Sequence, residues 1–233
     1  MAVTDVLQGG KLIRSLAGGV ADLPELSPEL RTAKNNAMLV AWESGNYDVV
    51  FKGGVKTSVS VESLPAPETV PEKWHVRFQK DRGGPAGQVL FDRLESWTKR
   101  PEDGIRYFSG TADYRQGVNI SEERLKSGRR VYLDLGDVRH LAEVFVNDKP
   151  LGVLWKPPYR VDITDAVKPG ANEMEVRVTN VWKNRLVGDQ KLPTESRLTW
   201  TFYPFYKAGD SLVDSGLLGP VRLLSSESVG LDP

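Results

Sequence analysis

One short segment, NVWKNRLVGDQ from Asn180 to Gln190, concentrates residue types that could bind a sugar. A sugar site needs a flat apolar ring against pyranose C–H groups, and planar amide, guanidinium and carboxylate groups that bond hydroxyl pairs. Trp182, Asn184, Arg185 and Asp189 supply all of these groups within one predicted loop. The structural alternative is that Arg185 and Asp189 pair with each other and fix the loop, while Trp182 belongs to the core.

A second candidate is LWKPPYR, from Leu154 to Arg160. Trp155 and Tyr159 flank the pair Pro157-Pro158, whose fixed φ angles make a stiff extended loop. Aromatic side chains on a preorganised loop suit recognition, because little entropy is lost on binding. The alternative is a strand connection whose aromatic side chains cover one end of the sheets.

A third aromatic segment, LTWTFYPFY, brings together Trp200, Tyr203, Phe205 and Tyr206. Its alternating pattern is typical of a strand, and it predicts that some of these rings point into the core.

Carboxylates on three predicted strands raise a separate question. Asp134, Glu143 and Glu175, with Arg177 among them, fall on the side of their strands opposite the apolar residues. Two carboxyl groups about 5–10 Å apart could act as a glycosidase pair, but an exposed ladder of ion pairs is the ordinary use of this pattern. In a small hydrolase, one of these three or Asp189 would act as the base.

The sequence lacks the residues and motifs that several metal and cofactor sites require. His75 and His140 are the only histidines and there is no cysteine, which excludes His-rich two-metal sites and thiolate chemistry. No Walker loop or G-x-G-x-x-G occurs, and we expect no nucleotide, flavin or haem. Calcium remains open, because it needs only carboxylate and carbonyl oxygens. The weak candidate ligands are Glu43, Asp48, Asp162 and Asp165.

Composition excludes several classes of partner. The chain of 233 residues has 31 basic and 31 acidic side chains, so no basic field indicates nucleic acid or an anionic membrane. No apolar run approaches the length of a membrane span. The N-terminal segment lacks the apolar core of a signal peptide. We therefore expect either a cytoplasmic protein or an excised piece of an exported enzyme.

Hydrophobic periodicity predicts an all-β fold. Short strand patterns with turn signals recur along the chain, whereas helical periodicity is almost absent. Only SPELRTA from Ser27 and SEERLKSG from Ser121 could form single helical turns. In the central strands, the residues predicted to face the core are Val131, Leu133, Leu135, Val144, Val146, Met174, Val176 and Val178.

These patterns predict a jelly-roll sandwich preceded by a small β element. The predicted organisation is residues 1–63 as an N-terminal loop and small β element and 64–72 as a Pro-rich linker. Residues 73–225 form the sandwich, and 226–233 form a tail.

The central stretch resembles a known family. VFVNDKPLG, an aromatic-Pro loop, DIT and the pattern G-x-N-x-x-x-V-x-V resemble the sugar-binding jelly roll of family 2 glycoside hydrolases. LPAPETVPEKWHVRF, LESWTKRPEDGIRYFSGTADY, TNVWKNRLVGDQKLP and SGLLGPVRL resemble the C-terminal region of family 106 glycoside hydrolases, the α-L-rhamnosidases.

The resemblance implies a galactose-binding-like fold and a carbohydrate-facing role. It does not carry the rhamnosidase active site, because the catalytic residues are expected on a preceding (β/α)8 barrel that this sequence does not contain. The leading hypothesis is a non-catalytic carbohydrate-binding module for a rhamnose- or galactose-containing glycan. The alternatives are a small stand-alone hydrolase for glycosides, esters or lactones, with or without calcium, and a structural buttress for a separate catalytic domain.

Overall fold

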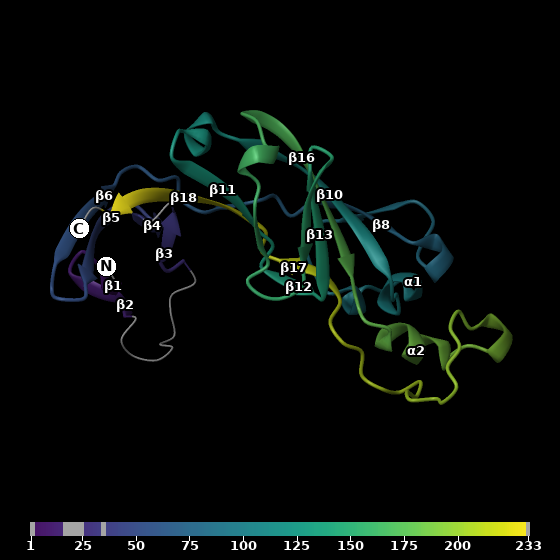
Figure 1. Cartoon of the computed structure of the whole chain (residues 1–233). Coiled ribbons are helices and arrows are strands. Elements are labelled where there is room, and N and C mark those ends of the chain that lie inside the picture. The colour runs from purple at the N-terminus through teal and green to yellow at the C-terminus, as the bar shows by residue number, and fades with distance from the viewer. Residues whose placement is uncertain (1–2, 16–25, 34–35, 232–233) are drawn as a thin grey trace. The chain divides into compact units, whose positions relative to one another are not determined.

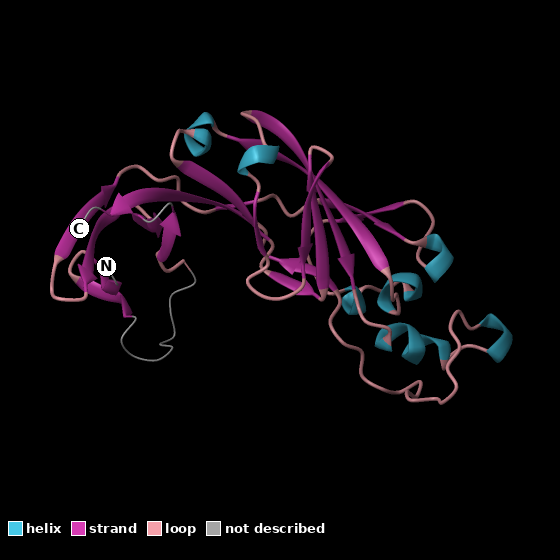
Figure 2. Ribbon diagram, viewed as in Figure 1, coloured by secondary structure: helices cyan, strands magenta, loops and turns pink. Residues whose placement is uncertain are grey.

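The computed structural model describes residues 3–15, 26–33 and 36–231, and its elements are mostly strands (Figure 2). The all-β prediction is therefore confirmed. Two compact units combine separate stretches of chain. The first contains Met1–Glu68, Ser121–Tyr132 and Leu223–Pro233, and the second contains Thr69–Ile120 and Leu133–Arg222. The sequence predicted four consecutive segments, 1–63, 64–72, 73–225 and 226–233. These boundaries stay a prediction.

The first unit contains a four-stranded antiparallel sheet. Its strand order is β2 (Lys11–Ser15), β1 (Val3–Gln8), β5 (Gly45–Phe51) and β6 (Lys56–Val61). Gly53 and Gly54, both with positive φ, close the hairpin between β5 and β6. Alternate residues of β5 are buried, which is the pattern of a strand with one face on a core.

The second sheet of this unit contains β3 (Glu29–Ala33), β4 (Asn36–Ala41), β18 (Arg222–Leu231) and β11 (Arg129–Asp134). The helical turn expected from Ser27 is wrong, because β3 pairs with β4 and places Leu30 opposite Leu39. Tertiary pairing overrides the local capping signal here. The expected tail also lies partly in β18, and Leu231 near its end is buried.

The second unit is built on a six-stranded antiparallel sheet (Figure 1). Its order is β14 (Lys149–Leu154), β13 (Leu141–Val146), β16 (Gly170–Thr179), β10 (Thr111–Ile120), β8 (Trp74–Phe78) and β9 (Gln88–Phe91). All eight residues predicted to face the core in the central strands are buried. The prediction of which apolar residues face the core is therefore confirmed.

Short elements complete the fold. The remaining strands are β7 (Glu68–Thr69), β12 (Asp137–Arg139), β15 (Arg160–Asp162) and β17 (Gly216–Gly219), of which β12 and β17 pair with each other. The helices are η1 (Lys80–Arg82), η2 (Trp97–Lys99), α1 (Asp103–Arg106), η3 (Glu122–Leu125), η4 (Thr164–Ala166), α2 (Lys183–Asp189) and η5 (Thr194–Ser196). The helical turn expected after Ser121 is η3. Among the described residues, no helix is long and apolar enough to cross a membrane.

Aromatic side chains fill the core of the second unit. Trp97 packs edge-on against Phe78 and Phe108, with ring centroids 5.3 and 5.5 Å apart. Its indole Nε1–H donates to the Tyr114 hydroxyl at 2.5 Å, and that hydroxyl also accepts from the Leu217 backbone N–H. Burial raises the pKa of Tyr114, so the phenol stays neutral.

Candidate functional site

The segment around Trp182 is a helix and not the loop expected from the sequence. It follows β16 directly, and α2 begins one residue after Trp182 (Figure 1). The buried side of α2 carries Asn184, Arg185 and Asp189 together with Val187 and Gly188. Because most of this side is polar, the segment has no apolar helical periodicity, and sequence reading could not detect the helix.

Asn184 is a structural anchor. Its amide Nδ2 donates to the Val213 carbonyl at 2.8 Å and to the Ser215 hydroxyl at 3.0 Å. Its Oδ1 accepts from the Val213 N–H at 2.9 Å. The side chain is fully buried. The structure therefore commits this amide to holding residues 213–215 and does not expose it to a ligand.

Arg185 and Asp189 form the ion pair of the structural alternative. Arg185 Nε lies 2.9 Å from Asp189 Oδ1, one helical turn apart, and both side chains are buried. The other carboxylate oxygen of Asp189 accepts from the backbone N–H of Thr199 at 2.8 Å and from its hydroxyl at 2.5 Å. Asp189 thus fastens the following segment to α2.

Trp182, by contrast, is not a core residue. Its side chain is 53% exposed, and the Arg82 guanidinium carbon lies 5.5 Å from the ring centroid. A cleft of about 430 Å³ opens beside it, lined by Arg82, Trp182, Leu186, Leu198, Thr199, Trp200 and Thr201. Two smaller hollows of about 150 and 220 Å³ also share Arg82 and Trp182. They add the polar residues Gln79, Asp81, Ser109, Thr111, Thr179 and Asn180, and the smaller hollow is also lined by Arg185.

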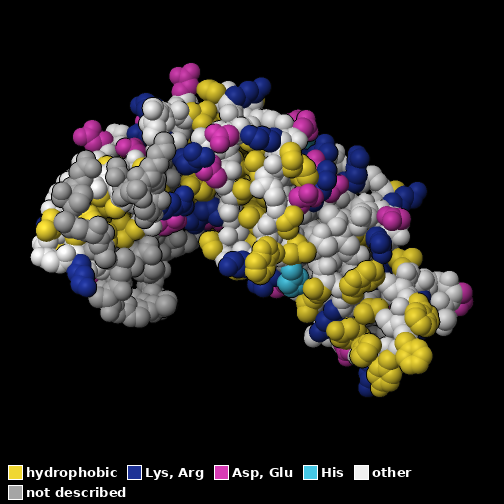
Figure 3. Space-filling model, in the orientation of Figure 1, with side chains coloured by type: hydrophobic (Ala, Val, Ile, Leu, Met, Phe, Trp, Pro, Cys, Tyr) yellow, Lys and Arg dark blue, Asp and Glu magenta, His cyan; other side chains and the backbone are white. Residues whose placement is uncertain are grey.

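The segment LTWTFYPFY is neither a strand nor core, so that prediction is wrong. Trp200 is 81% exposed and Phe202 is 93% exposed, and Tyr203 and Phe205 are also exposed. Hydrophobic side chains gather on the surface in the region of α2 (Figure 3). The alternation misled because the segment is held at Thr199 by Asp189 and pairs with no strand.

Sequence reading missed Arg82 as a lining residue, and it placed Trp200 in a segment expected to lie partly in the core. Arg82 lies at the end of η1, about a hundred residues before Trp182, next to the glycines Gly83 and Gly84. A Cβ atom at Gly84 would lie 2.6 Å from the Cβ of Phe78, so this turn packs closely on β8. The Gly-rich DRGG motif was the only local signal of a tight turn at this place.

The two aromatic side chains of the LWKPPYR segment differ in exposure. Trp155 is 67% exposed, and the Lys156 ammonium lies 5.4 Å from its ring centroid. Tyr159 is buried, and its hydroxyl donates to the His140 carbonyl at 3.2 Å. Neither side chain lines the hollows around Trp182.

Asp134 does not join the other carboxylates. It lies on β11, which is not in the same sheet as β13 and β16, the strands of Glu143 and Glu175, and it is 3% exposed. Its carboxylate pairs with Arg160 at 2.9 Å and with Arg222 at 3.4 Å. The expectation that it faces outward is wrong, because both faces of this end of β11 are covered.

Glu143 and Glu175 do lie on the outer face of adjacent strands, with Arg177 between them. Arg177 Nη1 is 3.7 Å from Glu143 Oε2, and Arg177 Nε is 2.6 Å from Glu175 Oε1. Arg115 also pairs with Glu175 at 2.6 Å. This arrangement is the ladder of ion pairs that the sequence pattern ordinarily indicates.

The candidate calcium ligands lie in separate places. Glu43 and Asp48 belong to the first unit, where Asp48 pairs with Lys56 at 2.9 Å and accepts from Ser58. In the second unit, Asp162 accepts from the backbone and the hydroxyl of Thr164, and the backbone carbonyl of Asp165 accepts from Lys149. No three His, Asp or Glu side chains of the described residues are grouped as metal ligands. Calcium stays a prediction.

Comparisons with known proteins agree with this fold. Residues 98–208 match the family described as glycosyl hydrolase 2 galactose-binding domain-like. A Formosa agariphila protein named as a putative beta-glucuronidase is 39% identical over 193 residues, which are 73% of this chain and 16% of that protein.

Two solved structures extend the comparison. The rhamnosidase of Novosphingobium sp. PP1Y is 29% identical with a TM-score of 0.65, over 89% of this chain and 24% of that enzyme. A beta-glucuronidase of an uncultured Clostridium sp. is 17% identical with a TM-score of 0.50, over 72% of this chain and 30% of that one, and shows the fold alone. The chain therefore spans less than a third of each of these proteins, and it contains a galactose-binding-like β domain of the glycosyl hydrolase 2 type.

Proposed function

We propose that this chain is a non-catalytic carbohydrate-binding module of a glycoside hydrolase, and that the cleft beside Trp182 holds the sugar. The observation that carries the proposal is that two exposed indole rings, Trp182 and Trp200, line one cleft with the Arg82 guanidinium. Indole faces pack on the C–H face of a pyranose, and a guanidinium donates to pairs of hydroxyls.

Buried contacts support this site by fixing the positions of both rings. Trp182 directly precedes α2, which Asn184 anchors at Val213 and Ser215. Thr199, the neighbour of Trp200, is held by Asp189. A site whose aromatic groups are already placed loses less conformational entropy when a ligand binds. Asn184 and Asp189 thus position the site, and Arg185, which also lines the smallest hollow, is held in place by its pair with Asp189.

The ligand that we propose is a rhamnose- or galactose-containing glycan. The resemblance of the motifs and the match to a galactose-binding-like family support a sugar. A rhamnosidase is among the similar structures, which favours rhamnose as one of the sugars to test.

Titration calorimetry with L-rhamnose, galactose and rhamnose-rich oligosaccharides tests the proposal. We expect binding by the wild type and at least a roughly fivefold loss of affinity in Trp182→Ala, by analogy with the roughly 1–3 kcal/mol that stacking of a nucleic-acid base on an aromatic side chain contributes. Trp155→Ala is the matched control, since Trp155 is an exposed tryptophan outside the cleft. Equal affinity in wild type and Trp182→Ala would refute the site.

A structural role beside a catalytic domain is the second candidate. Phe202, Tyr203 and Phe205 are exposed apolar rings of one segment, and exposed apolar patches mark interaction surfaces. About three quarters of the similar rhamnosidase lies outside the part matched here, and that remainder provides a candidate partner surface. Association with a separately produced catalytic domain, lost on replacing Phe202 and Phe205 by serine, is the expected result. Unchanged association in that variant would contradict this role.

The hydrolase alternative has weaker support. Asp134 and Asp189 are buried in ion pairs with arginines, where neither is placed to reach a substrate. Glu143 and Glu175 are both paired with Arg177. Hydrolysis of aryl glycosides, esters or lactones that disappears in Glu175→Gln would favour this alternative over the binding module.

A further inference from the structure

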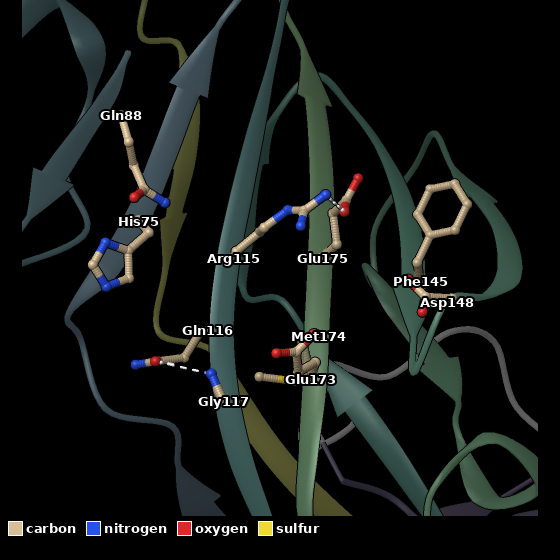
Figure 4. Close-up of a pocket in the computed structure, with 10 residues that line it drawn as sticks. All are labelled: His75, Gln88, Arg115, Gln116, Gly117, Phe145, Asp148, Glu173, Met174 and Glu175. Carbon is tan, nitrogen blue, oxygen red and sulfur yellow. Dashed lines mark hydrogen bonds and ion pairs between the residues drawn. The ribbon is translucent and has the colours of Figure 1, made fainter.

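A second hollow lies on the outer face of the six-stranded sheet (Figure 4). Its volume is about 310 Å³, near the lower end of the range for small-molecule sites. The lining includes His75, Gln88, Arg115, Phe145, Glu173 and Glu175, which come from β8, β9, β10, β13 and β16. It shares no lining residue with the cleft beside Trp182.

The hollow exists because β10 has a glycine in a row of long side chains. Arg115 lies opposite His75 on β8 and opposite Glu175 on β16. Two residues further along the same face of β10, Gly117 lies opposite Glu173. Since side chains on one face of a strand recur every second residue, Gly117 leaves the position beside Arg115 empty.

Neither the backbone nor packing requires glycine at this position. Gly117 is not among the glycines with positive φ, and a Cβ atom there would meet only the Asn172 carbonyl oxygen, 3.9 Å away. Glycine in the interior of a strand weakens it, and its common explanations are a bulge, a tight bend, or the close approach of another backbone or of a ligand. The register of β10 with β16 runs without a shift from Thr111 to Ile120, so no bulge explains it.

The hollow contains both hydrogen-bond donors and acceptors, among them the Arg115 guanidinium and the Glu175 carboxylate. Arg115 reaches from β10 toward Glu175, and the two side chains are paired at 2.6 Å (Figure 4). Arg177 holds the same carboxylate from the other side, also at 2.6 Å. Hydroxyl groups both donate and accept, so neighbouring hydroxyls of a sugar match a fixed guanidinium–carboxylate pair.

The charge of the lining selects among sugars. Asp148, Glu173 and Glu175 supply three carboxylates, whereas Arg115 supplies the one permanent positive charge. An anionic sugar would meet net repulsion here, and a neutral one would not. We infer that the hollow at Gly117 is a second sugar site, which binds a neutral pyranose unit. That the ligand is a sugar rests on the proposed function, whereas the existence of the hollow does not.

The test is an amide NMR titration of the whole chain with neutral galactose- and rhamnose-containing oligosaccharides. Gly117→Val fills the hollow, and we expect it to fold with unchanged or higher stability, because valine suits a strand better than glycine. Ligand-induced shifts of residues 115–117 and 173–175 should disappear in this variant and persist in Trp182→Ala. Arg115→Ala is the second variant, and it should lower the affinity obtained from the same shifts at least roughly fivefold.

The outcomes separate this inference from the proposed function. Shifts confined to the Trp182 cleft would overturn the second site and leave the first intact. Shifts at Gly117 without any near Trp182 would support the second site and overturn the first. Tighter binding of a uronate-containing oligosaccharide than of a neutral one at Gly117 would overturn the assignment of a neutral ligand.

Discussion

At the scale of single residues, the four predicted site residues at α2 differ in exposure: three are buried and fix the structure, and one is exposed to solvent. Trp182 is exposed at the start of the helix, whereas Asn184, Arg185 and Asp189 are buried behind it. The residue types of a sugar site were therefore recognised correctly, but only one of the four is exposed in the cleft. Sequence alone cannot distinguish an arginine that binds a ligand from one that pairs within its own helix.

Asp189→Ala tests this structural assignment. Removing the carboxylate leaves Arg185 buried without its partner and frees Thr199, and we expect a loss of about 3–5 kcal/mol in the free energy of unfolding. The matched control is Asp137→Ala, which removes an exposed aspartate paired with Arg139 at 2.9 Å, where a loss below about 1 kcal/mol is expected. Urea denaturation measures both. Equal losses would contradict the buried role of Asp189.

Asp113 gives a prediction about pH. Burial, together with the neighbouring Glu175 carboxylate, raises the pKa of Asp113 above its ordinary value. The folded state then binds this proton more tightly than the unfolded state, so the charged carboxylate lowers stability above its folded pKa. Asp113→Asn should raise the free energy of unfolding at pH 7, and the gain should vanish as the pH falls below the unfolded pKa.

Glu102→Gln is the opposite control for that titration. The hydrogen bond from Arg100 lowers the pKa of Glu102, so its charge contributes stability that is present at neutral pH and lost in acid. The two variants should therefore change stability at pH 7 in opposite directions. A loss of stability at pH 7 in Asp113→Asn would contradict the account of the outer sheet face.

At the scale of elements, strands were predicted better than helices. Val144, Val146 and Val176 lie at alternate positions of β13 and β16 and are buried as expected, because one face of their sheet is on the core. β3 was missed because its pairing with β4 is a tertiary contact that a capping pattern cannot report. α2 was missed because its buried side is mostly polar.

Close packing of α2 makes Gly188 a test of this element. A Cβ atom there would lie 2.6 Å from the Tyr107 Cβ and 2.6 Å from the Arg185 guanidinium. Gly188→Ala should therefore destabilise the protein by about 1–3 kcal/mol through overpacking, although alanine is the better helix former. Gly209→Ala, whose Cβ would meet nothing within 4 Å, is the control. Thermal unfolding that shows Gly188→Ala to be as stable as this control would contradict the packing.

At the scale of the whole chain, the sequence predicted the fold class and the kind of family, but not the composition of the site. Arg82 and Trp200 join Trp182 from elements about a hundred residues before it and beyond the end of α2. Gly117 carried no local signal, since its meaning depends on which strands lie on either side of β10. Such groupings arise only from tertiary structure.

The indole N–H resonances of the six tryptophans provide the most direct test of the central claim. On titration with rhamnose- and galactose-containing oligosaccharides, the signals of Trp182 and Trp200 should shift together and saturate with one affinity. The signals of Trp74 and Trp97, which are fully buried, should stay in place. Unchanged signals of both Trp182 and Trp200 at millimolar ligand, or a shift of Trp155 alone, would contradict a sugar site in this cleft.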